Sequence, residues 1–139
     1  MIVVDASVAY ALLDDRDAGH EAARSWYEQP HHDLLTTPLV LAEVDHLAEA
    51  RLGRSARSSF LSDIDRGGYH IAWWNSAAAE SAQIAQRYLD LGVSLTDASL
   101  VALAARLGTT SIATFDEGHF RAMQPLTGEP AFTLLPADA

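Results

Sequence analysis

Four acidic residues stand where the sequence is otherwise mostly apolar: Asp5, Glu43, Asp97 and Asp116. Carboxylates that meet in a folded protein repel one another, and this costs stability unless cations neutralise them. Divalent cations held in this way polarise a phosphodiester, lower the pKa of an attacking water and stabilise the leaving oxygen. If folding brings the four acids into one crevice, they predict metal-dependent cleavage of a phosphodiester.

Asp5 and Asp116 each follow a short run that we predict as a buried strand. Residues 2–4 (Ile-Val-Val) precede Asp5, and residues 111–114 (Ser-Ile-Ala-Thr) precede Asp116 after one phenylalanine. A polar residue directly after such a run marks the point where the strand reaches the edge of its sheet. Because ligands of open parallel sheets bind beyond the carboxyl ends of the strands, both acids are predicted at a ligand-binding edge.

Glu43 and Asp97 lie in two predicted helices. The first of these helices starts at Thr37 and Pro38, a cap residue with proline at the first helical position, and it carries Glu43. Ser94 stands three residues before Asp97, which is the spacing of a helix start, and this helix runs to residue 107. If both helices leave from the edge at which the strands end, all four acids point into one crevice.

The remaining predicted elements continue the alternation of strands and helices. We predict strands at residues 34–36, 69–74 and 132–135, a helical turn through residues 119–120, and helices at residues 6–13, 19–28, 54–66 and 76–90. This order predicts an α/β fold. The expected architecture is a three-layer sandwich in which helices flank a mainly parallel central sheet of about five strands. A length of 139 residues suits one domain, which we expect over residues 1–139.

The composition excludes several kinds of chemistry. The chain has no cysteine, so disulfides and thiolate metal sites are absent, and its metal ligands must be oxygen or imidazole, which favours Mg²⁺ or Mn²⁺. All nine basic residues are arginine. Without lysine the chain cannot form a Walker-type phosphate loop or a Schiff base. No charged-then-apolar leader or membrane-length apolar run is present, so we expect a cytoplasmic protein.

The net charge of −10 argues at first against nucleic acid as a partner, because phosphate binding usually requires a basic surface. Cations bound in an acidic cluster would reverse the local sign. The densest basic group comprises Arg54 and Arg57 with Arg51 nearby, and Arg121 lies close in sequence to Asp116. Arg54, Arg57 and Arg121 are candidates for binding RNA phosphates, although arginines on helix surfaces are usually solvated.

Each acid taken alone has a structural alternative. Asp97 is equally well explained as the acid of a capping box with Ser94, Asp5 as a helix cap, and Asp116 as part of a turn. Glu43 alone would most often be a solvated helix position. Its immediate neighbours are apolar, however, and a buried carboxylate there would be costly without a metal or a donor. The coincidence of four such placements favours the cluster.

The sequence resembles the PIN-domain ribonucleases, and within them the toxins of bacterial VapBC toxin–antitoxin systems. Four short motifs carry this resemblance, in order over nearly the whole chain: residues 4–7 (Val-Asp-Ala-Ser), 38–43 (Pro-Leu-Val-Leu-Ala-Glu), 95–100 (Leu-Thr-Asp-Ala-Ser-Leu) and 114–116 (Thr-Phe-Asp) followed by Phe120.

The resemblance implies an endoribonuclease that depends on Mg²⁺ or Mn²⁺. The metal-binding and catalytic acids of the family map to Asp5, Glu43, Asp97 and Asp116, with Ser7 and Thr114 as supporting hydroxyls. A homodimer, a structured RNA substrate (transfer RNA or ribosomal RNA) and a cognate VapB-type antitoxin that occludes the acidic pocket are also implied. Residues 42–47 resemble toxins that attack ribosomal RNA.

Other residues and functions are less well supported by the sequence. Glu43-x-x-His46 has the spacing of the metal ligands in di-iron helical bundles, but the sequence holds no second copy of this motif. His119 is expected to approach a phosphate at best. Trp73 and Trp74 would stack on bases or fill the core. A haloacid-dehalogenase phosphatase is disfavoured, because Ser7 stands where a second acid is needed and the lysine is missing. A PIN-like module that binds RNA or protein without cleaving it remains the alternative.

Overall fold

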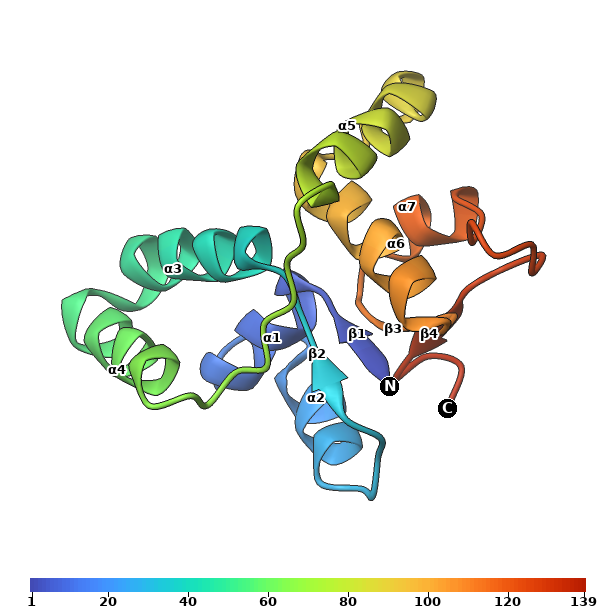
Figure 1. The fold of residues 1–139 in the computed structure, drawn as a ribbon. Coiled ribbons are helices and arrows are strands. Elements are labelled where there is room, and N and C mark those ends of the chain that lie inside the picture. The colour runs from blue at the N-terminus through green and yellow to red at the C-terminus, as the bar shows by residue number, and fades with distance from the viewer.

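Four strands and seven α-helices make up the computed structural model, which describes all residues from Met1 to Ala139 (Figure 1). The strands are β1 (Ile2–Val4), β2 (Leu34–Leu35), β3 (Ser111–Ala113) and β4 (Thr133–Leu135). The helices are α1 (Ala6–Leu13), α2 (His20–Tyr27), α3 (Pro38–Leu52), α4 (Arg54–Asp65), α5 (Ala77–Arg87), α6 (Leu95–Leu107) and α7 (Glu117–Ala122), with a 3₁₀ turn η1 (Leu89–Leu91) after α5.

The strands form one parallel sheet in the order β2-β1-β3-β4. In the centre, Val3 of β1 pairs with Ile112 of β3, and Val4 pairs with Ala113. The amide of Asp5 continues this ladder by donating to the carbonyl of Ala113 at 2.9 Å. The carboxyl ends of β1 and β3 therefore lie side by side, and this edge positions the candidate site.

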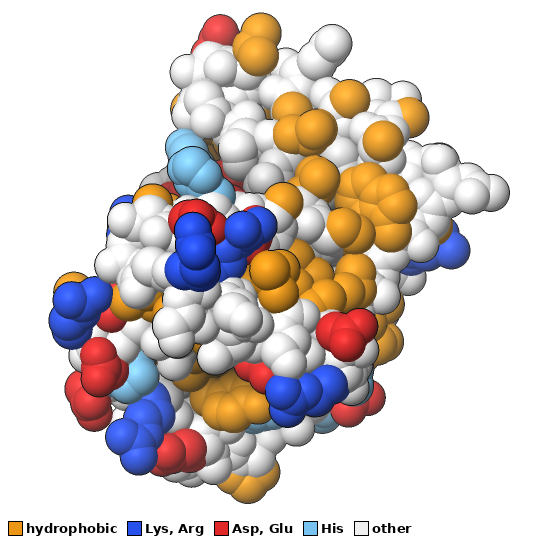
Figure 2. Space-filling model, turned by 90° about the vertical axis from the view of Figure 1, so that its left-hand side faces the viewer, with side chains coloured by type: hydrophobic (Ala, Val, Ile, Leu, Met, Phe, Trp, Pro, Cys, Tyr) orange, Lys and Arg blue, Asp and Glu red, His pale blue; other side chains and the backbone are white.

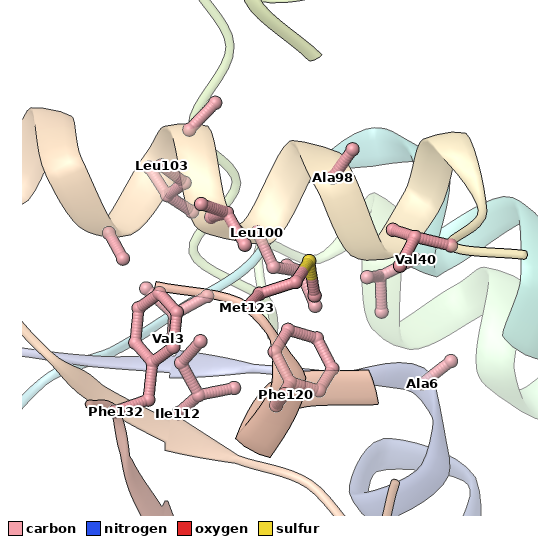
Figure 3. Close-up of a cluster of buried hydrophobic side chains, with 14 of the residues drawn as sticks. Val3, Ala6, Val40, Ala98, Leu100, Leu103, Ile112, Phe120, Met123 and Phe132 are labelled. Atoms are coloured by element: carbon pink, nitrogen blue, oxygen red, sulfur yellow. The ribbon is translucent and has the colours of Figure 1, made fainter. Parts of the chain in front are cut away.

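Helices cover both faces of the sheet, which confirms the expected three layers. On one face, α1 and α2 pack against Ile2 and Ala113 through a small buried cluster that includes Trp26. On the other face, α3, α6 and α7 enclose the main core above Val3 and Ile112. Figure 3 shows α6 lying over the strands, with Leu100 and Leu103 directed toward this face.

Helix α6 shows how local sequence sets its own ends. Its N-cap is Ser94, whose Oγ accepts a hydrogen bond from the amide of Asp97 at 3.0 Å. Its middle is continuously apolar, and every residue from Asp97 to Ala104 is buried. It ends at Gly108, which adopts a left-handed φ of 68° that favours glycine. The helix start therefore places Asp97 in the first turn, beside the strand ends.

The predicted strand over residues 69–74 is wrong, and the sheet has four strands instead of about five. Only Ile71 pairs at all, through an isolated parallel bridge to Thr36, the residue after β2. Strand β2 is two residues long because the chain enters α3 directly after Thr37, so no longer edge remains for a fifth strand to pair with. Ile71 is 43% exposed and Trp73 is 42% exposed, as expected for a segment that crosses the surface.

Candidate active site

The Asp5 carboxylate is buried at the carboxyl end of β1 and is held by two hydroxyls. Ser7 Oγ and Thr114 Oγ1 both donate to Asp5 Oδ2, at 2.9 and 2.8 Å. In turn, Ser7 Oγ accepts from the amide of Phe115 and Thr114 Oγ1 accepts from the amide of Asp116, both at 2.9 Å. Asp5 occupies the N-cap position of α1 without a side-chain cap bond, so the hydroxyls, and not the helix, orient it.

His119 lies between the carboxylates of Asp97 and Asp116. Its Nδ1 is 3.1 Å from Asp97 Oδ2 and 3.0 Å from Asp116 Oδ2. Asp116 is the N-cap of α7, and its Oδ1 accepts from the amide of His119 at 3.2 Å. Asp116 therefore caps α7 through one carboxylate oxygen, in place of the turn offered as an alternative, while its second oxygen faces the cluster.

Asp97 faces the cluster and not its own helix end. Ser94 caps α6, as described above, whereas the Asp97 carboxylate contacts His119. The residue is 8% exposed. Burial, together with the negative charges of Asp5 and Asp116, raises the pKa of Asp97 from 3.8 to about 6, although the contact with His119 opposes the rise. The carboxylate is thus held in a place that disfavours its charge.

The pKa of Asp5 is raised as well, because burial outweighs the stabilising hydrogen bonds from Thr114 and Ser7. Partial desolvation lowers the pKa of His119, but its contacts with Asp97 and Asp116 raise it overall. Neighbouring acids that resist ionisation, beside an imidazole that favours it, mark a site with an excess of negative charge. A bound cation would relieve that excess.

Glu43 is exposed on α3, the solvated helix position that the sequence left open, although its immediate neighbours in the sequence are apolar. The helix turns Val40, Leu41 and Val44 into the core and leaves position 43 outside. Desolvation raises the pKa of Glu43, and so do the charges of the other three acids. Its carboxylate is therefore close enough to the cluster to interact with it electrostatically, at the outer side of the site.

A hydrogen bond between two hydroxyls links the start of α3 to α6, the two helices that carry Glu43 and Asp97, and no pattern in the sequence predicts it. Thr37 Oγ1, before α3, lies 2.9 Å from Ser99 Oγ of α6, and Ser99 Oγ donates to the carbonyl of Thr96 at 2.6 Å. Thr37 is the predicted N-cap, but its side chain makes no cap bond. Both hydroxyls are fully buried, so only long-range contact information could have paired them.

Three residues offer ligand atoms that all lie within 4.8 Å of one another: Asp97, Asp116 and His119. Asp5 adjoins this group, linked to Asp116 through Thr114. Carboxylate oxygens and an imidazole nitrogen suit divalent cations such as Mg²⁺ and Mn²⁺. Together with the raised pKa of the buried acids, this donor set fits a divalent cation.

The predicted RNA-gripping arginines are not equivalent. Arg57 pairs with Asp45 at 2.6 Å and with Glu49 at 3.0 Å. Arg121 pairs with Glu117 at 2.9 Å and with Asp138 at 2.7 Å. Arg54 is exposed and makes no ion pair. On the face that includes α3 and α4, Figure 2 shows blue and red side chains intermixed, without a continuous basic surface.

Other histidines and the tryptophans lie outside this cluster. His46 is exposed on α3, and His31 is exposed with its ring stacked on Trp26. Trp74 is half-buried beneath the guanidinium of Arg106, whereas Trp73 is exposed. No helix has the length and apolar character that a membrane span requires.

Comparison with known proteins agrees with the geometry. The model of the PIN domain family matches residues 2–124. Ribonuclease VapC26 of Mycobacterium tuberculosis is 33% identical over 138 residues, covering 97% of this chain and all of that protein. Among solved structures, M. tuberculosis VapC20, described as a sarcin–ricin loop cleaving toxin, superposes with a TM-score of 0.76. The match covers 84% of this chain and 90% of the VapC20 chain. At 23% sequence identity, it shows that the two proteins share a fold.

Proposed function

Since this chain belongs to the PIN domain family, we propose that it is an endoribonuclease dependent on Mg²⁺ or Mn²⁺ and acts as the toxin of a toxin–antitoxin pair. The observation that carries this proposal is the convergence of Asp5, Asp97 and Asp116 at the carboxyl edge of the sheet, with Glu43 at its outer side. The relative named as a ribonuclease supports the same reaction.

In this proposal, the carboxylates of Asp97 and Asp116 hold the cation and Asp5 completes its surroundings. Ser7 and Thr114 fix one oxygen of Asp5, which leaves the other without a side-chain donor. Glu43, exposed and close to all three, would accept a proton or contact the entering water from the open side. A divalent cation, when bound, supplies the Lewis acidity that phosphodiester cleavage requires.

The proposed substrate is structured RNA, either transfer RNA or ribosomal RNA, in the cytoplasm. The structure with the same fold is described as cleaving the sarcin–ricin loop, which makes ribosomal RNA the first substrate to try. Of the three predicted arginines, only the exposed Arg54 has no acidic partner, so it is the most available of the three to meet a phosphate.

A VapB-type antitoxin is the proposed partner. We assign its binding site to a groove with a volume of about 930 Å³. The groove reaches Val4 and Thr36, which adjoin the strand end that carries Asp5. Its walls combine apolar side chains, among them Leu12, Leu35 and Val40, with the arginines Arg24 and Arg66 and the acids Asp33 and Asp63, which suits an amphipathic segment. None of the four acids lines the groove, so an occupant there would lie next to the acidic site.

We also propose a homodimer. Three leucines are exposed within one seven-residue stretch that runs from η1 to the first residue of α6: Leu89, Leu91 and Leu95. Single exposed leucines are common, but three in one stretch form an apolar surface that a second copy would cover. The mass of the purified protein in solution, measured by light scattering, tests this expectation.

RNA cleavage by Asp5→Asn tests the proposed function. Amidation removes a charge at the centre of the site while keeping its shape, so we expect cleavage of ribosomal and transfer RNA with Mn²⁺ to fall at least about 100-fold. Asp15→Asn is the matched control, because Asp15 is exposed and lies outside the cluster. Equal cleavage by wild type and Asp5→Asn would refute the assignment, and Mn²⁺ binding without cleavage of any RNA would favour the non-cleaving module.

A further inference from the structure

We infer that His119 is a nitrogen ligand of the cation site, alongside Asp97 and Asp116, and that this gives the chain a stronger preference for Mn²⁺ over Mg²⁺ than carboxylates alone would give. The inference rests on the proposed function in that it concerns the same cation site. It differs from the sequence expectation, which assigned the cation to four carboxylates and gave His119 no ligand role.

The position of His119 is the first support. Its Nδ1 lies 3.1 Å from Asp97 Oδ2 and 3.0 Å from Asp116 Oδ2, so it fills the space between the two carboxylates. The three ligand atoms lie within 4.8 Å of one another, a span that one ion can bridge. To bind an ion held by both acids, the imidazole would release the Nδ1 proton that it shares with these carboxylates and offer its lone pair instead.

The second support is that packing and ion pairs fix α7, and with it the backbone of His119. Phe120 and Met123, which flank the helix end on its inner side, are fully buried in the main core. On its outer side, Arg121 pairs with Glu117 of the same helix and with Asp138 near the end of the chain. The helix is therefore fastened on both sides, and His119 is presented to the acids without a large loss of conformational freedom on binding.

The chemical consequence follows from ligand preference. Mg²⁺ takes oxygen ligands almost exclusively, whereas imidazole suits transition metals. Replacing one oxygen donor by nitrogen therefore increases the affinity for Mn²⁺ relative to Mg²⁺. None of the other five histidines belongs to a group of this kind, so any nitrogen ligand in this site must be His119.

His119→Asn tests the inference, because the asparagine Oδ1 takes approximately the place of the imidazole Nδ1 and offers oxygen instead of nitrogen. The protein would be titrated with Mn²⁺ alone and with Mg²⁺ alone by calorimetry, with no RNA present. We expect the Mn²⁺ Kd to rise about tenfold in His119→Asn, and the Mg²⁺ Kd to change by less than about threefold. His32→Asn is the control, since His32 is exposed on a loop outside the site.

Electron spin echo spectroscopy of bound Mn²⁺ supplies a readout that folding effects cannot imitate. Wild type and His32→Asn should show nitrogen modulation from an imidazole, and His119→Asn should bind Mn²⁺ without it. Mn²⁺ binding without nitrogen modulation in wild type, or modulation that survives in His119→Asn, would overturn the inference and leave the proposed function standing. No Mn²⁺ binding by wild type would overturn both.

Discussion

Asp97→Asn should stabilise the metal-free protein at neutral pH. The folded state raises the pKa of Asp97 from 3.8 to about 6, which corresponds to a penalty on the order of 3 kcal/mol for the charged form at 1.36 kcal/mol per pKa unit. The penalty is fully present above the folded pKa and disappears below the unfolded pKa, because the folded state binds the proton more tightly. Amidation removes it at pH 7.5.

The pKa of about 6 already includes the opposing contact with His119, so this contact is not subtracted a second time. We therefore expect a gain of up to about 3 kcal/mol, which is a rise in Tm of roughly 9 °C for a chain of this size. At pH 4, where wild-type Asp97 is largely protonated, the difference should nearly vanish.

Thermal unfolding followed by circular dichroism in EDTA, at pH 7.5 and at pH 4, measures both values. Asp15→Asn serves as the control, because this exposed acid has no place in the cluster. Adding Mn²⁺ should raise the Tm of wild type and not that of Asp97→Asn, which would reverse their order. If Asp97→Asn unfolds at a lower temperature than wild type in EDTA at pH 7.5, the carboxylate is not strained by its surroundings and the reasoning fails.

Two further predictions concern the surroundings of the site. Arg121 lowers the pKa of Asp138 to about 2. This pair therefore contributes stability above the unfolded pKa of 3.8, and the contribution is lost as the pH falls toward 2. Asp138→Asn should lower the urea midpoint of unfolding at pH 7, and the difference from wild type should shrink below pH 4. A Cβ at Gly19 would lie 2.6 Å from the exposed ring of Phe115, next to the site. Gly19→Ala should therefore displace the Phe115 ring. If RNA bases stack on this ring, kcat/KM for RNA should fall about tenfold while the Kd for Mn²⁺ stays unchanged. Unaltered cleavage would show that Phe115 does not touch RNA.

Most of the fold could be predicted because its signals are local. The run at residues 2–4 forms β1, and the run before Asp116 forms β3. Helix α6 begins after its N-cap Ser94 and ends at its C-cap Gly108, as these residue types predict. The segment at residues 69–74 failed for a reason that no local pattern contains. Its β-branched and aromatic residues favour a strand, but the neighbouring strand β2 is too short to pair with it.

The candidate site was predictable in its acids and less so in their surroundings. Asp5 and Asp97 were placed correctly at element junctions, because strand ends and helix starts are visible in the sequence. The exposure of Glu43 depends on which face α3 turns to the core, and an almost uniformly apolar stretch does not reveal that face. The place of His119 between two acids depends on how α7 packs against α6, which is a tertiary contact.

Anomalous diffraction from crystals grown with Mn²⁺ tests the central claim most directly, namely that distant carboxylates meet to hold a cation. We predict a manganese peak at about 2 to 2.5 Å from carboxylate oxygens of both Asp97 and Asp116. A protein saturated with Mn²⁺ whose only manganese peaks lie away from these two residues would contradict the account.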